Sequence, residues 1–142
     1  MQPKIYFEKI LNTREHIDYL YTSLEKRTHN VSHRQMPSYD EHKVFVNNHP
    51  YRTWMLVKMS KDIIGNFYLQ KDNSIGVHLD EGKFEFFSQT IDAILRKWKP
   101  LEGIKSIRNQ NFVFNVAYGN NDLVKELENI GAQKIQSTYL IK

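Results

Sequence analysis

The feature that most constrains the fold is the stretch from residue 74 to residue 98, where a strand pattern leads into a helix pattern. Residues 74–79 alternate between apolar and small or polar side chains, which predicts a short strand. Residues 82–98 carry apolar side chains at helical spacing and predict an amphipathic helix. These side chains are Phe84, Phe87, Ile91, Ile94, Leu95 and Trp98. A polar turn at residues 80–83 places free backbone amides at the helix start, which favours an anion. An ordinary strand-turn-helix connection is the simpler interpretation of this stretch alone.

Composition limits the classes of protein to consider. The 142 residues are 40% hydrophobic and 25% charged, the balance of an ordinary globular protein, so one domain spanning residues 1–142 is expected. The absence of cysteine excludes disulfides, thiolate metal ligands and a cysteine nucleophile. No apolar run approaches the roughly 20 residues that span a bilayer, and the first residues lack a signal-peptide core. A cytoplasmic protein without membrane association is therefore expected.

Charge and histidine spacing argue against two further classes. The net charge of +4 only weakly favours acidic or phosphate-bearing ligands. Lysine and arginine are spread along the chain instead of forming a run, so a nucleic-acid partner is not expected, and a basic nucleic-acid-binding module is the least favoured alternative. His42 and His49 are seven residues apart and lack a third ligand at a useful spacing, so no metal site is expected.

Alternation and turn signals place the remaining elements. Capping-box patterns at Asn12/Glu15 and Ser38/Glu41 open two helices. Three strands between residues 51 and 79 are joined by short polar turns and form an antiparallel meander, whereas the strand after the central helix is expected to be parallel to its neighbour. The other expected elements are a first strand at 4–11, helices ending near 26 and before 50, a strand within 105–116, a last helix at 120–131 and a closing strand at 133–141.

This order of elements, read with three local patterns, resembles the GNAT family of acyl-CoA N-acyltransferases over essentially the whole chain. The first pattern is the Ile-Gly-Asn-Phe sequence within strands at 54–69, and the second is the strand at 74–79 that leads into the central helix. The third is Asn-Val-Ala-Tyr-Gly-Asn followed by an apolar helix, with Asn120 eleven residues before Gly131. The resemblance implies a three-layer α+β fold. Its mixed, mostly antiparallel sheet would have six to seven strands, with about four helices and with strands four and five splayed apart.

The resemblance also implies a cosubstrate, acetyl-CoA. In this family the pantetheine arm lies between the splayed strands, and the pyrophosphate lies on the amides that open the central helix. The residues placed around acetyl-CoA are Val77, His78, Leu79, Gly82, Lys83, Asn115 and Asn120. The helical stripe directs Phe84 into the core, so Phe86 is expected to obstruct the phosphates, and Glu81 and Glu85 to repel them.

The preferred hypothesis is an N-acetyltransferase that moves an acetyl group from acetyl-CoA to a primary amine by direct attack. The acceptor is a small molecule or a protein. His78 is the candidate base because histidine titrates near neutral pH, and an outward-facing strand histidine is the alternative. Tyr118 and Tyr139 are the candidate acids, with aromatic packing as the alternative for either. The loop at 27–38 and the last strand are expected to hold the acceptor, and the arginines favour an anionic acceptor. The candidate acceptor-binding residues are His33, Arg34 and Arg52.

Two departures from the family pattern support an alternative, a GNAT-like domain that no longer catalyses and serves as a binding or dimerising module. Members usually carry Arg/Gln-x-x-Gly-x-Gly/Ala at the helix start, and this chain keeps only Gly82 and Lys83. The tyrosine that protonates the leaving thiolate in many members corresponds to Leu127. A homodimer is one expected assembly of either form.

Overall fold

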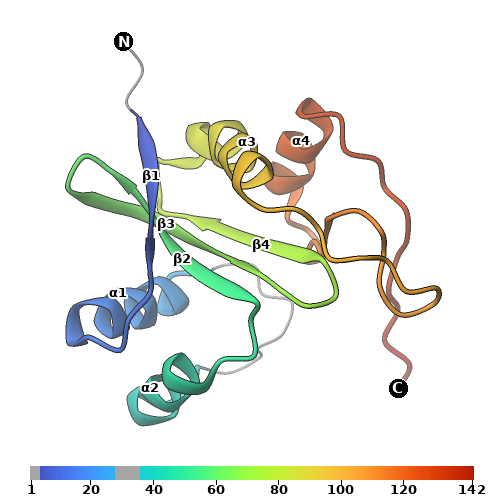
Figure 1. Cartoon of the computed structure of the whole chain (residues 1–142). Coiled ribbons are helices and arrows are strands. Elements are labelled where there is room, and N and C mark those ends of the chain that lie inside the picture. Colours follow the sequence, from blue (N-terminus) through green and yellow to red (C-terminus); the bar gives the residue numbers. More distant parts are fainter. Residues whose placement is uncertain (1–3, 28–35) are drawn as a thin grey trace.

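The computed structural model describes residues 4–27 and 36–142, and its elements follow the expected order with one exception at the end of the chain (Figure 1). The elements are β1 (Ile5–Lys9), α1 (Arg14–Glu25), α2 (Tyr39–Asn48), β2 (Thr53–Met59), β3 (Asp62–Leu69), β4 (Ser74–Leu79), the 3₁₀ helix η1 (Phe84–Phe86), α3 (Phe87–Lys97), β5 (Val113–Phe114) and α4 (Asn121–Asn129). Within these residues, every helix is too short or too polar to cross a membrane.

One mixed sheet holds the strands in the order β1-β2-β3-β4-β5. Neighbours from β1 to β4 are antiparallel, and β4 and β5 are parallel, because a helical crossover joins them. The register pairs Asn66 with His78 and Tyr68 with Gly76, so these four residues share one face of the sheet. The predicted meander and the predicted parallel pair are confirmed.

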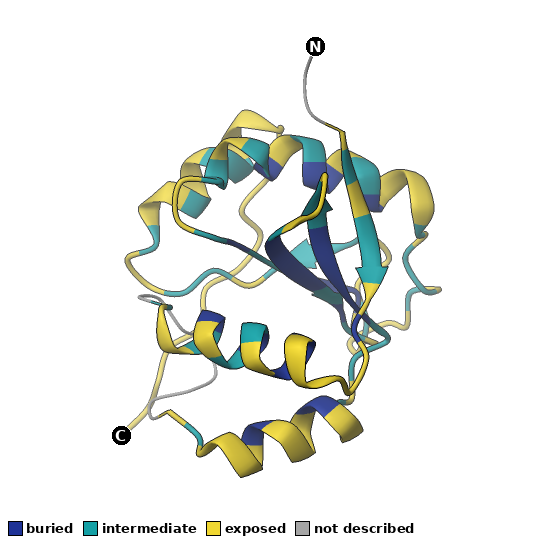
Figure 2. Ribbon diagram, turned by 90° about the vertical axis from the view of Figure 1, so that its left-hand side faces the viewer, coloured by how far each residue is buried: buried dark blue, intermediate teal, exposed yellow. Residues whose placement is uncertain are grey.

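Helices cover both faces of the sheet, and Figure 2 shows the buried strands between the two helical layers. α1 and α2 cover one face, and α3 covers the other. The larger core lies on the α3 face; its buried residues are Met55, Val57, Ile64, Phe67, Leu69, Ile75, Leu79, Phe87, Ile91 and Ile94. A smaller core on the α1 face contains Ile10, Ile17, Leu20, Val46, Trp54 and Leu56. Full burial of such a side chain contributes about 1.5–3 kcal/mol, so these two cores hold the layers together.

Local capping explains where the first helices begin. Ser38 and Glu41 form the predicted capping box, in which each side chain bonds the backbone N–H of the other. α1 begins one residue later than predicted, because the hydroxyl of Thr13, and not the side chain of Asn12, accepts the His16 N–H over 3.3 Å.

A buried asparagine fixes the loop between α3 and β5. Asn73 is fully buried, and its Nδ2 donates to the carbonyl oxygens of Leu101 and Asn109, each over 2.8 Å. Its Oδ1 accepts the Leu101 N–H over 2.8 Å, and its own carbonyl oxygen accepts the Val113 N–H over 2.9 Å. Every polar atom of this amide is therefore satisfied, and both ends of the loop are held beside the start of β4.

The predicted number of six to seven strands is wrong, since the described residues form five. β5 has only two residues, and residues 133–141, predicted as a closing strand, form no strand and are exposed. Alternation records the two faces of a strand but not the edge with which it pairs. A segment with a strand pattern but no neighbouring strand to pair with therefore has no regular secondary structure.

Candidate active site

β4 and β5 pair over only two residues and then part. The parallel ladder joins Ser74 to Val113 and Ile75 to Phe114, and it ends there. β4 continues to Leu79, so its last four residues have no strand beside them on that side in the described parts of the chain. The divergence of strands four and five predicted from the sequence is confirmed.

The alternation of backbone groups decides which part of β4 is open. Just past the strand end, the Asp80 N–H donates to the carbonyl oxygen of Ile64 over 2.8 Å, so even-numbered residues of this stretch face β3. The N–H and C=O groups of Val77 and Leu79 consequently face the side that β5 has left. Such groups can pair with an extended, amide-bearing ligand as they would with another strand.

A tight turn follows β4 and brings Gly82 and Lys83 to the start of the central helix. The Lys83 N–H donates to the carbonyl oxygen of Asp80 over 2.9 Å. Gly82 has a φ of 78°, which glycine adopts without strain and which other residues rarely adopt. The glycine at this position is therefore required by the turn itself.

The central helix begins as a 3₁₀ turn, which leaves several amides free. The Phe86 N–H donates to the carbonyl oxygen of Lys83 over 3.0 Å. Within the described residues, the backbone amides of Gly82, Phe84 and Glu85 have no hydrogen-bond acceptor. Free amides at a helix start attract an anion, so this turn keeps the property inferred from the sequence.

The two phenylalanines of this turn do not obstruct it. Phe84 and Phe86 are both half-buried and pack against the α3-face core, and the Phe84 ring lies 5.5 Å from the ring of Phe87. The predicted obstruction by Phe86 is therefore wrong, because its ring packs against the core as the ring of Phe84 does. Glu81 and Glu85 are exposed beside the free amides, where their charges oppose an anion.

A polar and aromatic cluster lies on the α1 face of the sheet. The rings of Tyr51 and Tyr68 stack with centroids 4.2 Å apart and planes 6° apart. The Tyr68 ring also fills the space above Gly76, where a Cβ atom would lie 2.6 Å from Cε1 of the ring. We define the tyrosine cluster as Tyr19, Arg27, Tyr51, Tyr68 and His78.

Arg27 brings a positive charge to the tyrosine cluster from the end of α1. Its Nε is buried and has no hydrogen-bond partner within residues 4–27 and 36–142, and no carboxylate of those residues forms an ion pair with it. Burial lowers the pKa of Arg27, and the nearby hydroxyls of Tyr68, Tyr51 and Tyr19 oppose that shift. A partly buried guanidinium without a counter-charge among the described residues is costly, so an anionic ligand would be stabilising here.

His78 lies on the same face of the sheet as Tyr68 and completes the cluster. Burial lowers the pKa of His78 to about 4, and the charge of Arg27 adds to the effect. The imidazole is therefore neutral at pH 7 and able to accept a proton. Burial is the larger cause of this low pKa, and the charge of Arg27 is the smaller one.

Tyr19 connects α1 to the end of β4. Its hydroxyl donates to Oδ1 of Asp80 over 2.9 Å. Burial and the Asp80 charge raise the pKa of Tyr19, and burial raises the pKa of Asp80 against the effect of this hydrogen bond. The bond therefore fixes α1 against the strand that carries His78.

The predicted site residues fall into separate places. His78 joins the tyrosine cluster, and the predicted cofactor residues Val77, Leu79, Gly82 and Lys83 follow one another along β4 and its turn. These five residues are continuous along the backbone at the open end of β4, but the side chains of Val77 and Leu79 face the α3-side core and that of His78 faces the α1 side.

The other predicted site residues in the described part of the chain are Asn115, Tyr118 and Asn120, which follow β5, and Arg52, which precedes β2. Asn115 is exposed directly after β5, and Asn120 caps α4, since its Oδ1 accepts the Leu123 N–H over 3.4 Å. Tyr118 is fully exposed and makes no ring contact within the described residues. The Arg52 guanidinium donates to the carbonyl oxygen of Lys99 over 2.8 Å, beside the end of α3.

His33 and Arg34 lie outside the described residues. The sequence analysis missed Tyr19, Tyr51, Tyr68 and Asp80 as members or neighbours of the site. A signal existed in the alternation of β3 and β4, where Asn66, Tyr68, Gly76 and His78 fall on one face once the hairpin register is known.

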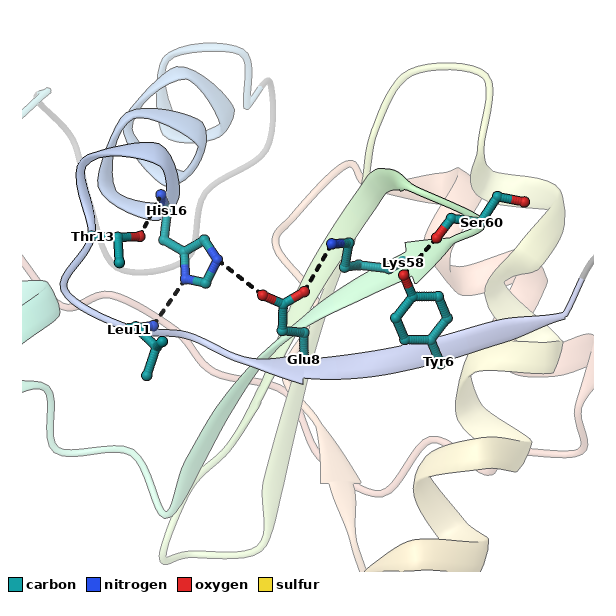
Figure 3. Close-up of polar contacts among 7 residues, drawn as sticks. All are labelled: Tyr6, Glu8, Leu11, Thr13, His16, Lys58 and Ser60. Atoms are coloured by element: carbon teal, nitrogen blue, oxygen red, sulfur yellow. Dashed lines mark hydrogen bonds and ion pairs between the residues drawn. The ribbon is translucent and has the colours of Figure 1, made fainter.

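A second polar cluster joins β1, β2 and α1 (Figure 3). Glu8 accepts from Lys58 Nζ over 2.8 Å and from His16 Nε2 over 3.3 Å. Nδ1 of His16 accepts the Leu11 N–H over 3.0 Å, so the proton of the neutral ring lies on Nε2. Both ring nitrogens have partners, which leaves neither for a substrate. This cluster therefore anchors α1 to the sheet.

A pocket of about 650 Å³ lies in the loop between α3 and β5. Its arginine, Arg108, is already bonded, with Nε donating to the Glu102 carbonyl oxygen over 2.7 Å and Nη1 donating to the Lys71 carbonyl oxygen over 3.2 Å. The described residues contain no group of three side chains placed to hold a metal ion. The open end of β4 and the tyrosine cluster are therefore the better candidate site.

Comparison with known proteins shows the fold. No protein-family model and no curated protein matches the chain. A domain from Methanocaldococcus jannaschii DSM 2661 superposes with a TM-score of 0.73 at 15% identity, covering 96% of this chain and 93% of that one. A possible acetyltransferase from Clostridium difficile 630 superposes with a TM-score of 0.56 at 13% identity, covering 97% of each chain. At such identities the likeness is one of fold.

Proposed function

We propose that this protein is an acyl-CoA N-acyltransferase that moves an acetyl group from acetyl-CoA to a primary amine. The observation that carries the proposal is the open half of β4, where the backbone groups of Val77 and Leu79 face the side that β5 has left. The pantetheine arm contains two amides and pairs with such groups as an added strand would. The fold shared with a possible acetyltransferase adds support.

The pyrophosphate of acetyl-CoA would lie on the free amides of Gly82, Phe84 and Glu85, with Lys83 adding a positive charge. The carboxylates of Glu81 and Glu85 oppose it by up to about 1 kcal/mol each at exposed sites. We therefore expect an affinity that depends strongly on these charges and on salt.

The tyrosine cluster would receive the amine. In the reaction, the amine nitrogen attacks the thioester carbonyl carbon, the C–N bond forms, the C–S bond breaks, and the thiolate leaves. Neutral His78 accepts the proton that the amine loses. An anionic group of the acceptor would pair with Arg27, which removes one of the two causes that lower the pKa of His78. The base thus strengthens when an anionic acceptor binds.

Calorimetry with acetyl-CoA tests the cofactor site. Lys83→Ala should weaken binding, most of all at low salt, and Glu85→Gln should tighten it. Lys43→Ala removes an exposed lysine on α2, the opposite layer of the fold, and should change nothing. Absence of binding both in the unmodified protein and in the Glu81→Gln/Glu85→Gln double variant would overturn the proposal.

Turnover tests the acceptor side. Over a panel of amines with and without a phosphate or carboxylate group, His78→Gln should lower kcat by roughly 10²-fold or more with little change in acetyl-CoA affinity. Arg27→Gln should raise KM for the anionic amines and leave the neutral ones unchanged. Full turnover in the His78 variant would assign His78 a structural role.

A second candidate function is a domain that binds acyl-CoA, or a partner, without catalysis. It is favoured by Leu127, which stands where the family's acid tyrosine is expected and packs against the α3-face core. The exposure of Tyr118 points the same way. Binding of acetyl-CoA with no acetylation of any amine in the panel would support this candidate over the enzyme.

A further inference from the structure

The end of the chain, from α4 onward, leaves several apolar side chains in water. α4 has no buried residue, and Val124 and Ile130 are 37% and 36% exposed. Every residue from 131 to 142 is exposed, including Tyr139 at 86% and Ile141 at 91%. Exposed apolar side chains gathered in one part of a chain can mark a surface that meets a partner.

The sheet has an unused edge in the same region. The Val113 N–H donates to the Asn73 carbonyl oxygen over 2.9 Å, so the backbone of Val113 faces β4. The backbone groups of Phe112 and Phe114 therefore face the opposite side. No strand of the described residues lies there, since β5 ends the sheet. An unpaired edge of this kind is a template for another strand.

The chain also contains a segment with a strand pattern that pairs with no strand of the described residues. Residues 133–141 alternate, with Ile135, Tyr139 and Ile141 on one side. In Figure 1 this segment runs down the right-hand side of the molecule without secondary structure. At roughly 3.3 Å per residue it would extend about 30 Å, long enough to cover β5 and the residues around it.

We propose that two copies of this chain exchange these segments, so that residues 133–141 of each copy pair with β5 of the other in a two-fold dimer. The unpaired edge of β5 and the unpaired strand pattern at residues 133–141 belong to the same chain. In a two-fold dimer each copy's edge can therefore pair with the other copy's segment. The exchange gives backbone partners to the edge and covers the apolar side chains of the segment. It also accounts for the shortness of β5, whose outer side is unpaired in a single copy.

Charge favours a second copy as the occupant. The segment carries Lys134 and no acidic residue and is followed by Lys142, whereas α4 carries three acidic residues and one lysine. Only six residues separate the end of β5 from the start of α4, so the opposite charges of the segment and of this helix favour a second copy over an acidic partner. Each copy would contribute a strand of nine residues, the edge it covers and part of α4, which approaches the roughly 20–30 residues per side of a specific interface.

Light scattering during gel filtration tests the proposal on the full chain at micromolar concentration. The unmodified protein should elute as a dimer, and the Tyr139→Asp/Ile141→Asp double variant as a monomer with an unchanged helical circular-dichroism signal. Tyr118→Asp, a matched change at an exposed tyrosine outside the segment, should remain dimeric. A monomeric unmodified protein, or a double variant that stays dimeric, would overturn the proposal.

Engineered cysteines identify the segment's partner, because the chain has none of its own. Asn115→Cys protein mixed with Ser137→Cys or Thr138→Cys protein should form a disulfide-linked dimer under oxidation, since pairing brings Cα atoms within about 7 Å. A single chain that carries both cysteines should also link to a second chain. Linking only within one chain would show that the segment folds back on its own sheet and would refute the exchange.

Discussion

Gly76→Ala tests how tightly the Tyr51/Tyr68 stack packs against the backbone of β4. A Cβ atom at Gly76 would lie 2.6 Å from Cε1 and 2.5 Å from the hydroxyl oxygen of Tyr68. Carbon atoms in contact are normally about 3.5–4.0 Å apart, so the ring must move by about 1 Å or more. The ring is not free to do so, because it stacks on Tyr51 at 4.2 Å.

Overpacking of this kind typically costs about 1–3 kcal/mol, and we expect a loss of about 2 kcal/mol in the free energy of unfolding for Gly76→Ala. Urea denaturation measures it. The m-value should not change, because the folded and unfolded states keep their compactness.

A double-mutant cycle isolates the contact. In Gly76→Ala/Tyr68→Ala the added methyl group meets no ring. The double variant should therefore lose about 1–2 kcal/mol less stability than the sum of the losses of the two single variants. Gly82→Ala is the control, since no atom lies within 4 Å of its added Cβ and its cost comes from the φ of 78° alone. Its loss should add to that of Tyr68→Ala. If the losses in the free energy of unfolding also add for Gly76→Ala and Tyr68→Ala, the packing argument is refuted.

Three further predictions concern the other polar groups. Burial, and then the Arg27 charge, lower the pKa of His78 from 6.5 to about 4, so the folded state binds fewer protons than the unfolded chain in this window. Stability should rise with pH from 4 to 6.5, by up to about 3 kcal/mol from this group, and urea melts of His78→Asn should show a flatter pH dependence. His16→Gln removes the acceptor of the Leu11 N–H and should lower stability by about 2 kcal/mol, whereas His16→Asn keeps an acceptor there and should cost about half as much in the same assay; equal losses would contradict the assigned tautomer. Asn73→Ala breaks three side-chain hydrogen bonds and places alanine at a φ of 69°, so thermal and urea melts should show a loss of about 3 kcal/mol, with Asn73→Gly milder by about 1 kcal/mol.

Local signals predicted most of the fold because they act within a few residues. The capping box at Ser38 and the meander between residues 51 and 79 depend on side chains and turns that lie next to one another in sequence. The start of α1 shifted by one residue because Asn12 and Thr13 are both competent caps, and only the geometry of the entering chain decides between them.

Long-range features were harder to predict. The prediction of a closing strand at residues 133–141 was wrong. The alternating pattern is present, but such a pattern does not show which neighbouring strand the segment would pair with. The tyrosine cluster combines Tyr19 of α1 with Tyr51 and Tyr68 from segments far apart in sequence, so the packing of α1 on the sheet and the pairing of the strands together bring them to one place. The low pKa of His78 follows from that burial and from Arg27, neither of which a strand pattern records.

The hydrogen bonds of Asn73 have a consequence for how this protein can change in length. They hold Leu101 and Asn109 beside β4, and the bridge between Ile104 and Arg108 closes the chain that lies between them. Residues 105–107 therefore lie between two positions that are held in place. An insertion or deletion there would leave the angle between β4 and β5 unchanged. Related chains should vary in loop length there, and the 650 Å³ pocket should be the part of the molecule that diverges first.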